Sequence, residues 1–244
     1  FMHSCYAFGA LLCPFLIAVA LNGTRALPMF VLAACGILLW IVFIVTPMDT
    51  EEKQKVKTTD WSFPKDKKFW LITGLLFSQN AAETSVTGWL VTYFKGSGMI
   101  SGELSPYTVT IMWSATLIAR ILIAFVIPIK NASSAMIKMG IGCIIFYVGL
   151  MMANTQMSAI LLLFAFAFSM AGMNPTAVAS AGRMTSVTSM GVMLPVASSG
   201  AIIMPWIIGI VAEYAGIELG MASNVIPCVT MLLFAIAIKR LSIE

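Results

Sequence analysis

Charged residues are scarce in this chain of 244 residues. Asp, Glu, Lys and Arg together make up 10% of it, against about 25% in a soluble globular domain, whereas 60% of the residues are hydrophobic. This composition excludes water as the main solvent of the folded chain. Histidine occurs once, at position 3. The sequence therefore offers no histidine pair with metal-ligand spacing, and we expect no metal site.

Sequence motifs of enzymes are also missing. No GxSxG, HExxH, P-loop or GxGxxG pattern occurs, and no two acids have catalytic spacing. The five cysteines fall within hydrophobic stretches and show no CxxC or Cys/His spacing, which favours small buried side chains over disulfides. The sequence thus predicts neither an enzyme nor a cofactor.

Long hydrophobic runs are what the sequence has instead. About 20 apolar residues cross about 30 Å of hydrocarbon as a helix, and lipid offers the backbone no other hydrogen-bond partners. Strands would be about half as long and would alternate in polarity. We predict an all-α integral membrane protein with eight transmembrane helices, over residues 2–21, 27–45, 69–93, 106–128, 135–153, 158–180, 190–212 and 219–238.

The basic residues predict how these helices are oriented. Lys and Arg in short loops are retained on the cytoplasmic side. If the spans alternate, eleven basic residues lie on one side, six of them in the 46–68 segment, and two, Arg25 and Lys95, lie on the other. We therefore expect both termini to be cytoplasmic, most simply at the plasma (cytoplasmic) membrane. The net charge of +4 then reflects topology and not affinity for nucleic acid.

Polar residues interrupt the third predicted span. Gln79, Asn80, Glu83 and Thr87 fall on one helix face, and Glu83 is the only acid deep inside a predicted span. A charge at the bilayer centre costs about 2.5–3.5 kcal/mol on insertion scales, so this face must look into the bundle or a water-filled cavity. Glu83 either exchanges a proton near neutral pH or stays protonated and bridges two helices.

Arg120 is the only base deep inside a predicted span, and Trp113 shares its helix face. Two interpretations remain open for this arginine. It is either a cavity residue that pairs with Glu83 or with an anionic substrate, or it snorkels to the cytoplasmic interface and bonds carbonyls at a helix end.

The sixth predicted span carries a second polar stripe. Ser169 and Thr176 share one face with Asn174 alongside, and they serve either solute binding or helix packing. Proline and glycine interrupt this span and the next, at Pro175, Pro195, Gly200 and Pro205, which predicts bends.

Five stretches resemble helices of the major facilitator superfamily of transporters. "FGALLCPFLIA" looks like its fifth helix. "AAETSVTGWLVTYF" and "MWSATLIARILIAF" are similar to the seventh and eighth helices of the fucose-permease-like sugar and proton symporter branch, although Ala119 replaces the usual glycine before arginine. "AFSMAGMNPTAVAS" and "SGAIIMPWIIGIVAEYAG" look like the tenth and eleventh helices. The resemblance covers essentially the whole chain, as helices five to twelve of a twelve-helix fold.

The resemblance implies a division of the chain. Residues 1–45 would be the last two helices of the N-terminal six-helix half, 46–68 the cytoplasmic linker, and 69–244 the C-terminal half. Helices one, four, seven and ten line the substrate path in this superfamily, so Glu83 would face a central cavity from helix seven. The Asp-Arg-x-Gly-Arg loop common after helix eight is degenerate here ("VIPIKNASS"). Helices one to four would be missing partners of this chain.

The expected function is secondary active transport of a small polar solute by alternating access, with a sugar as the implied solute class and protons as candidate coupling ions. A fragment without helices one to four is not expected to transport alone. The alternative is an eight-span membrane enzyme or scaffold. Expected solute-binding residues are Gln79, Asn80, Glu83, Thr87, Trp113, Ser169, Asn174 and Thr176, with Glu83 also in proton coupling and Arg120 as its candidate charge partner.

Overall fold

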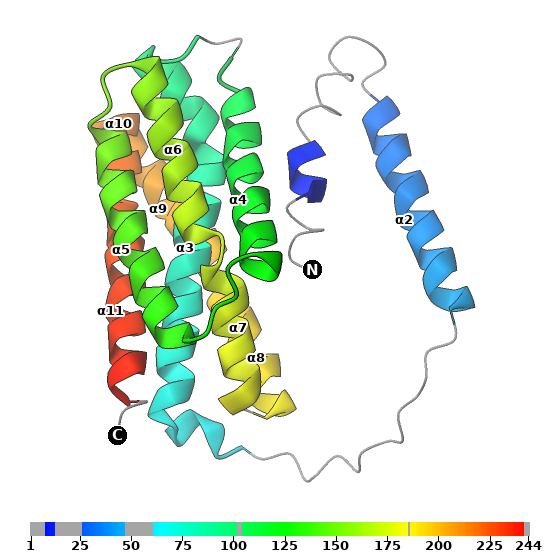
Figure 1. Cartoon of the computed structure of the whole chain (residues 1–244). Helices are drawn as coiled ribbons and strands as arrows, with labels where there is room; N and C mark the ends of the chain where they lie inside the picture. Colours follow the sequence, from blue (N-terminus) through cyan, green and yellow to red (C-terminus); the bar gives the residue numbers. More distant parts are fainter. Residues whose placement is uncertain (1–7, 13–25, 47–60, 102–103, 185, 242–244) are drawn as a thin grey trace.

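The computed structural model describes residues 8–12, 26–46, 61–101, 104–184 and 186–241, and the regular elements in these ranges are all helical (Figure 1). Most of the first predicted span, 2–21, and most of the predicted linker, 46–68, lie outside the described residues. Of that first span, residues 8–12 are described, and they are helical.

The other seven predicted spans all fold as helices, close to the predicted bounds. The second has the predicted bounds, and the last three are each divided into two segments. The elements are α2 (Leu27–Val45), the 3-10 turn η1 (Phe63–Lys65), α3 (Lys67–Ser97), α4 (Tyr107–Phe125), α5 (Ala132–Met151), α6 (Gln156–Met170), α7 (Met173–Met184), α8 (Val187–Ser198), α9 (Gly200–Ala215), α10 (Ile217–Ala222) and α11 (Val225–Leu241).

Six helices of the described chain are long and apolar enough to cross a membrane. They are α2, α4, α5, and the combined segments Gln156–Gly182, Thr188–Ala215 and Ile217–Leu241. The molecule is therefore a helical membrane protein by this criterion. α3 has 31 residues, more than a span needs, but the polar residues along its centre lower its hydropathy and keep it outside this set. The predicted number of eight spans stays a prediction.

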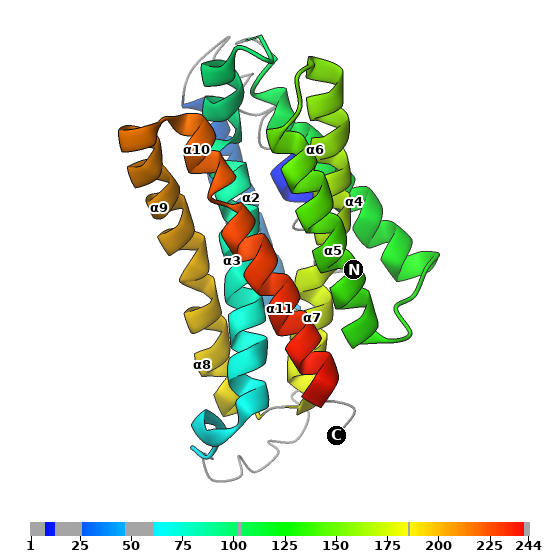
Figure 2. The same cartoon turned by 90° about the vertical axis from the view of Figure 1, so that its left-hand side faces the viewer.

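Helix α3 lies inside the bundle. It packs against α11, α9 and α8 and also contacts α4 and α7. Figure 2 shows it between the α8–α9 pair and α11. Asp66 caps its start by accepting a hydrogen bond from the Lys68 amide at 2.9 Å, and it ends at Gly98, whose φ of 66° suits the left-handed conformation that glycine adopts most easily. The polar helix thus has neighbours on several sides.

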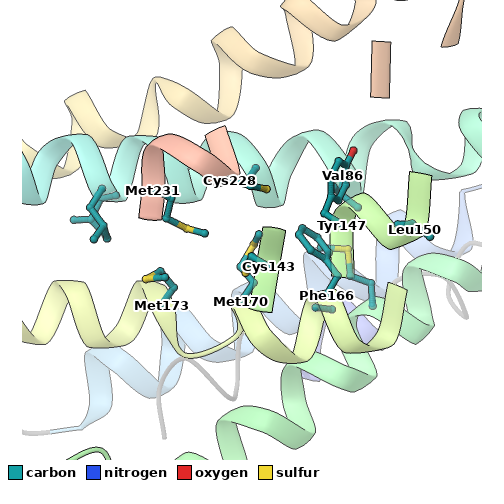
Figure 3. Packing of buried hydrophobic residues seen from close by; sticks show 14 of the residues in the cluster. Val86, Cys143, Tyr147, Leu150, Phe166, Met170, Met173, Cys228 and Met231 are labelled. Carbon is teal, nitrogen blue, oxygen red and sulfur yellow. The ribbon is translucent and has the colours of Figure 1, made fainter. Parts of the chain in front are cut away.

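The apolar core fills the space between α3, α5, α6 and α11 (Figure 3). Val86, Cys143, Phe166 and Cys228 are fully buried there, so the two cysteines serve as small apolar side chains. The Tyr147 hydroxyl donates a 2.7 Å hydrogen bond to the Met221 carbonyl, next to the break between α10 and α11. The core therefore anchors one of the breaks directly.

Three breaks divide the last three spans. They fall at residues 171–172, at Ser199 and at residues 223–224, whereas α3, α4 and α5 are continuous. Two of the breaks lie beside sequence interruptions that predicted bends: Pro175 follows the first by three residues, and Gly200 directly follows the second. The unbroken helices thus precede the broken ones in the sequence.

Helix α2 stands apart from the others in Figure 1. Pro28 is the only one of its residues that is buried, although its mean hydropathy is 2.7. Its side chains gain almost no apolar partner within the described chain, which suits a helix surrounded by lipid or by further helices.

Candidate functional site

A polar cavity of about 310 Å³ lies between α3, α4 and α7. Four of its residues come from α3, two from α4 and one from the first turn of α7. The lining residues are Asn80, Glu83, Thr84, Thr87, Trp113, Arg120 and Asn174. The face of α3 that was predicted to avoid lipid therefore borders this cavity.

The two oxygens of the Glu83 carboxylate have different neighbours. Oε1 lies 3.9 Å from Nη2 of Arg120, and Oε2 accepts a hydrogen bond from Nε2 of Gln79. The exposed fractions are 7% for Arg120 and 17% for Glu83, so both charges sit largely away from solvent. A buried charge is tolerated when it is paired and hydrogen-bonded, and each of these two residues provides the other with a partner of opposite charge.

A chain of amides extends from this carboxylate to two further helices. Asn174 Nδ2 donates to Gln79 Oε1 at 2.7 Å and lies 3.4 Å from Asn80 Oδ1. Asn80 Nδ2 in turn donates to the Ala197 carbonyl on α8 at 3.2 Å. These bonds fix the amide orientations and connect α3 to α7 and α8 through side chains at the cavity wall.

Arg120 also holds the break between α6 and α7. Its Nε donates to the Ala171 carbonyl at 3.1 Å. In a continuous α-helix this carbonyl would accept the amide four residues later, but that residue is Pro175, which has no N–H. The arginine therefore satisfies a carbonyl that the proline leaves without its usual partner, and it links the carboxylate to the break.

The structure places the Arg120 side chain in a buried position beside Glu83, as the cavity interpretation required. It does bond a carbonyl at a helix end, as the snorkelling interpretation required, but that end is the break inside the bundle.

The structure brings five of the eight expected solute-binding residues to the polar cavity: Asn80, Glu83, Thr87, Trp113 and Asn174. Gln79 is 1% exposed and lies behind the cavity wall, where it connects Glu83 to Asn174. Their predicted solute contacts stay predictions.

Two expected residues lie elsewhere. Ser169 lines a separate groove between α4, α5 and α6, because the break in the sixth span separates it from Asn174. Thr176 is 8% exposed and is not among the residues that line the cavity. Ser169 and Thr176 were assigned to one stripe on the assumption that the sixth span is a single straight helix.

Thr84 is a lining residue that the expected set omitted. It is exposed, next to Glu83 in the sequence, and it lies within the same polar stretch of α3. A polar face wider than the one drawn through Gln79, Glu83 and Thr87 would have included it.

The arrangement provides hydrogen-bond donors and acceptors of every common kind. Arg120 donates, the Glu83 carboxyl oxygens accept, and the Asn80 and Asn174 amides and the Thr84 hydroxyl can do both. The Trp113 ring adds an apolar wall. Such a set of groups suits a small polar molecule and carries no net charge when the ion pair is formed. In the described part of the chain, no group of three His, Cys, Asp or Glu residues could hold a metal ion.

No protein-family model matches this chain, and no curated protein matches it. The similarity to the major facilitator superfamily therefore rests on the five quoted stretches of sequence alone. It remains a prediction here.

Proposed function

We propose that this chain belongs to a secondary transporter of the major facilitator type, which moves a small polar solute across a membrane by alternating access. A sugar is the solute class that the resemblance suggests. The observation that carries the proposal is the polar cavity, a space of about 310 Å³ lined by Glu83, Arg120, amides and hydroxyls within an apolar helical bundle. Charges at such a depth are costly in a membrane protein and commonly mark a substrate or ion pathway.

The broken helices support the same proposal. Many secondary transporters build their sites from discontinuous helices near the middle of the membrane. Here the break between α6 and α7 lies beside the polar cavity, since Asn174 lines the cavity and Arg120 bonds the Ala171 carbonyl. Movement of α7 relative to α6 would thus change the cavity lining directly.

Proton coupling is part of the proposal, with Glu83 as the proton-binding group. Its carboxylate is the one acid of the cavity lining, and Arg120 is the one charged neighbour within 4 Å that the structure describes. Protonation would weaken that ion pair and free the Arg120 guanidinium to contact a solute. One charge moving down about 100 mV supplies about 2.3 kcal/mol, enough for roughly 50-fold accumulation.

The test uses the full-length gene product reconstituted in liposomes. Candidate solutes, beginning with monosaccharides, are first screened by the thermal unfolding midpoint of the purified protein. Uptake of each stabilising solute is then measured with and without an inward proton gradient. Solute accumulation that depends on the gradient is the expected result.

Glu83→Gln is the decisive variant. We expect it to lose accumulation driven by the proton gradient but to retain exchange of labelled for unlabelled solute, because the glutamine imitates the protonated carboxyl. The matched control is Glu213→Gln, at an exposed residue near the end of α9, which should accumulate solute like the wild type. Undiminished proton-driven accumulation in Glu83→Gln would remove Glu83 from the coupling step. Absence of uptake for every stabilising solute would favour the alternative of a membrane enzyme or scaffold.

A further inference from the structure

A second hollow lies outside the polar cavity, and we call it the α4–α5 groove. It has a volume of about 270 Å³ and runs between α4, α5 and α6. Most of its wall is apolar. The residues used below are Leu122, Ile123, Lys138, Met139, Phe168 and Ser169.

The groove opens onto the outer surface of the bundle. Phe168 is 39% exposed, and Lys138 on α5 is also exposed. An apolar depression on the outer surface of a helical membrane protein suits an acyl chain as its occupant.

Lys138 gives the groove a polar end. It lies six residues after the start of α5, a rise of about 9 Å, and a lysine at that depth can extend its ammonium group to the membrane interface. The structure shows no carboxylate within 4 Å of this lysine among the described residues.

The sequence explains why no counter-ion is near. Residues 104–212 contain no Asp or Glu at all, although they include all of α4, α5 and α6. Lys130, in the connection between α4 and α5, adds a second exposed positive charge to this region. The charge that would complement Lys138 must therefore come from outside these helices.

Ser169 supplies a further polar contact within the groove. Ser169 lies on α6, and its Oγ is close to Gly142 on α5. A hydroxyl in this position can donate to an ester carbonyl, the group that joins a phospholipid chain to its headgroup.

From these observations we infer that the α4–α5 groove binds an anionic phospholipid. Lys138 contacts the headgroup phosphate, Ser169 contacts an ester carbonyl, and one acyl chain lies along Leu122, Ile123 and Phe168. Basic pockets between transmembrane helices are a known way for proteins to recognise acidic lipid headgroups. The site is separate from the polar cavity, and its assignment does not depend on transport.

The groove also borders the break between α6 and α7. Ile123 and Met139 are so close to Gly172 that a side chain added there would collide with both of them. A lipid in the groove thus lies behind the same break that Arg120 holds from the cavity side.

The test is native mass spectrometry of the purified full-length protein in detergent, titrated with phosphatidylglycerol or with phosphatidylcholine of the same chains. We expect one tightly retained phosphatidylglycerol and weaker retention of phosphatidylcholine. Lys138→Gln should weaken phosphatidylglycerol binding about fivefold, the effect of one lysine near a lipid phosphate, and should leave phosphatidylcholine unchanged. The control Lys95→Gln, at the other end of the bundle, should bind like the wild type.

A second variant tests the apolar part of the site. Leu122→Trp fills the groove and should reduce retention of both lipids, and its thermal unfolding midpoint verifies that it has folded. Equal phosphatidylglycerol affinity in Lys138→Gln and the wild type would overturn the assignment. Unchanged retention in folded Leu122→Trp would overturn it as well, as would displacement of the lipid by inorganic phosphate, which would indicate a site for free anions.

Discussion

Glu83 is a carboxylate with a cation on one side and an amide on the other. Arg120 approaches one oxygen at 3.9 Å and Gln79 binds the second, while the same arginine satisfies the Ala171 carbonyl that Pro175 leaves open. Each of these groups would be costly inside a bundle without the others. The cavity lining is therefore stable as a set of mutually dependent partners.

This dependence predicts the effect of removing the arginine. Arg120→Met should lower the free energy of unfolding by about 3 kcal/mol, because it leaves a buried carboxylate and a buried carbonyl without their donor. The double variant Arg120→Met/Glu83→Gln should lose less free energy of unfolding than Arg120→Met alone, because no charge is then unpaired. Chemical unfolding of the purified protein in detergent measures both, with Arg240→Met, at an exposed position, as a control expected to change stability by less than about 0.5 kcal/mol. Equal losses in the single and double variants would contradict the pairing.

At the scale of single elements, α3 presents two unlike faces. Ala82 and Val86 are fully buried in the core, whereas Thr84 is exposed and borders the polar cavity. Because each residue is rotated by about 100° around the helix axis, residues on the two faces lie only one or two positions apart in the sequence. One helix thus contributes both to packing and to the cavity wall.

Cysteine labelling should resolve these faces. In a background without native cysteines, Thr84→Cys in the full-length protein should react with a water-soluble maleimide, and Ala82→Cys, at a position with 0% exposure, should not. The readout is the mass added per protein after a timed reaction. Protection of Thr84→Cys together with labelling by a lipid-soluble maleimide would show that this face meets hydrocarbon, and the polar cavity would then be wrong.

Helix α9 begins in direct contact with α3, and Gly200 makes that approach possible. A Cβ atom at this position would lie 3.1 Å from the Phe77 carbonyl carbon and 3.3 Å from the Ala81 nitrogen. These are backbone atoms, so they cannot turn aside as a flexible side chain would. Close packing of α3 and α9 therefore depends on the missing side chain.

The same substitution should act in opposite directions at two glycines. Gly200→Ala should destabilise the protein by about 1–3 kcal/mol, because α3 and α9 must separate. Gly191→Ala, in α8, places its methyl group in open space and should be neutral or stabilise by up to about 1 kcal/mol through helix propensity. Thermal unfolding of both variants tests this. A neutral Gly200→Ala would mean that the two helices pack less closely than described.

At the scale of the whole molecule, basic residues gather at one end of the bundle. Figure 1 shows the start of α3 and the end of α11 at the same end, and these segments carry Lys67, Lys68, Lys239 and Arg240. Lys95 lies at the opposite end of α3. This is the distribution that the positive-inside rule predicts for α3 and α11, although the rule and not the structure assigns the side.

Labelling from one side of the membrane would test that orientation. In sealed right-side-out vesicles, Lys95→Cys should react with an impermeant thiol reagent, while Lys130→Cys and Lys239→Cys should react only in inverted vesicles. Each cysteine variant is labelled in both vesicle preparations, so each variant serves as its own control. The opposite pattern would reverse the predicted topology, and labelling of Lys130→Cys and Lys239→Cys from different sides would contradict the predicted arrangement of the spans.

The sequence by itself determined that the described chain is helical and membrane-embedded. Lipid provides no backbone partners, so apolar runs such as 27–45 had to be helices, and α2 has those bounds. The sequence also predicted that the face of α3 with Glu83 turns away from lipid, because charge in hydrocarbon is costly. Both inferences follow from the residues along single helices and need no knowledge of how the helices pack together.

Only the tertiary structure decided which polar groups meet. The Asn174 amide reaches Gln79, and Arg120 reaches the Ala171 carbonyl, across 95 and 51 residues of chain. Such contacts depend on how helices cross and where they break, and neither is set by local periodicity. The break also placed Ser169 in the α4–α5 groove, although its spacing from Thr176 suggested a shared face. Pro175 carried the signal for one of these contacts, since a proline four residues after Ala171 leaves a carbonyl that some donor must satisfy.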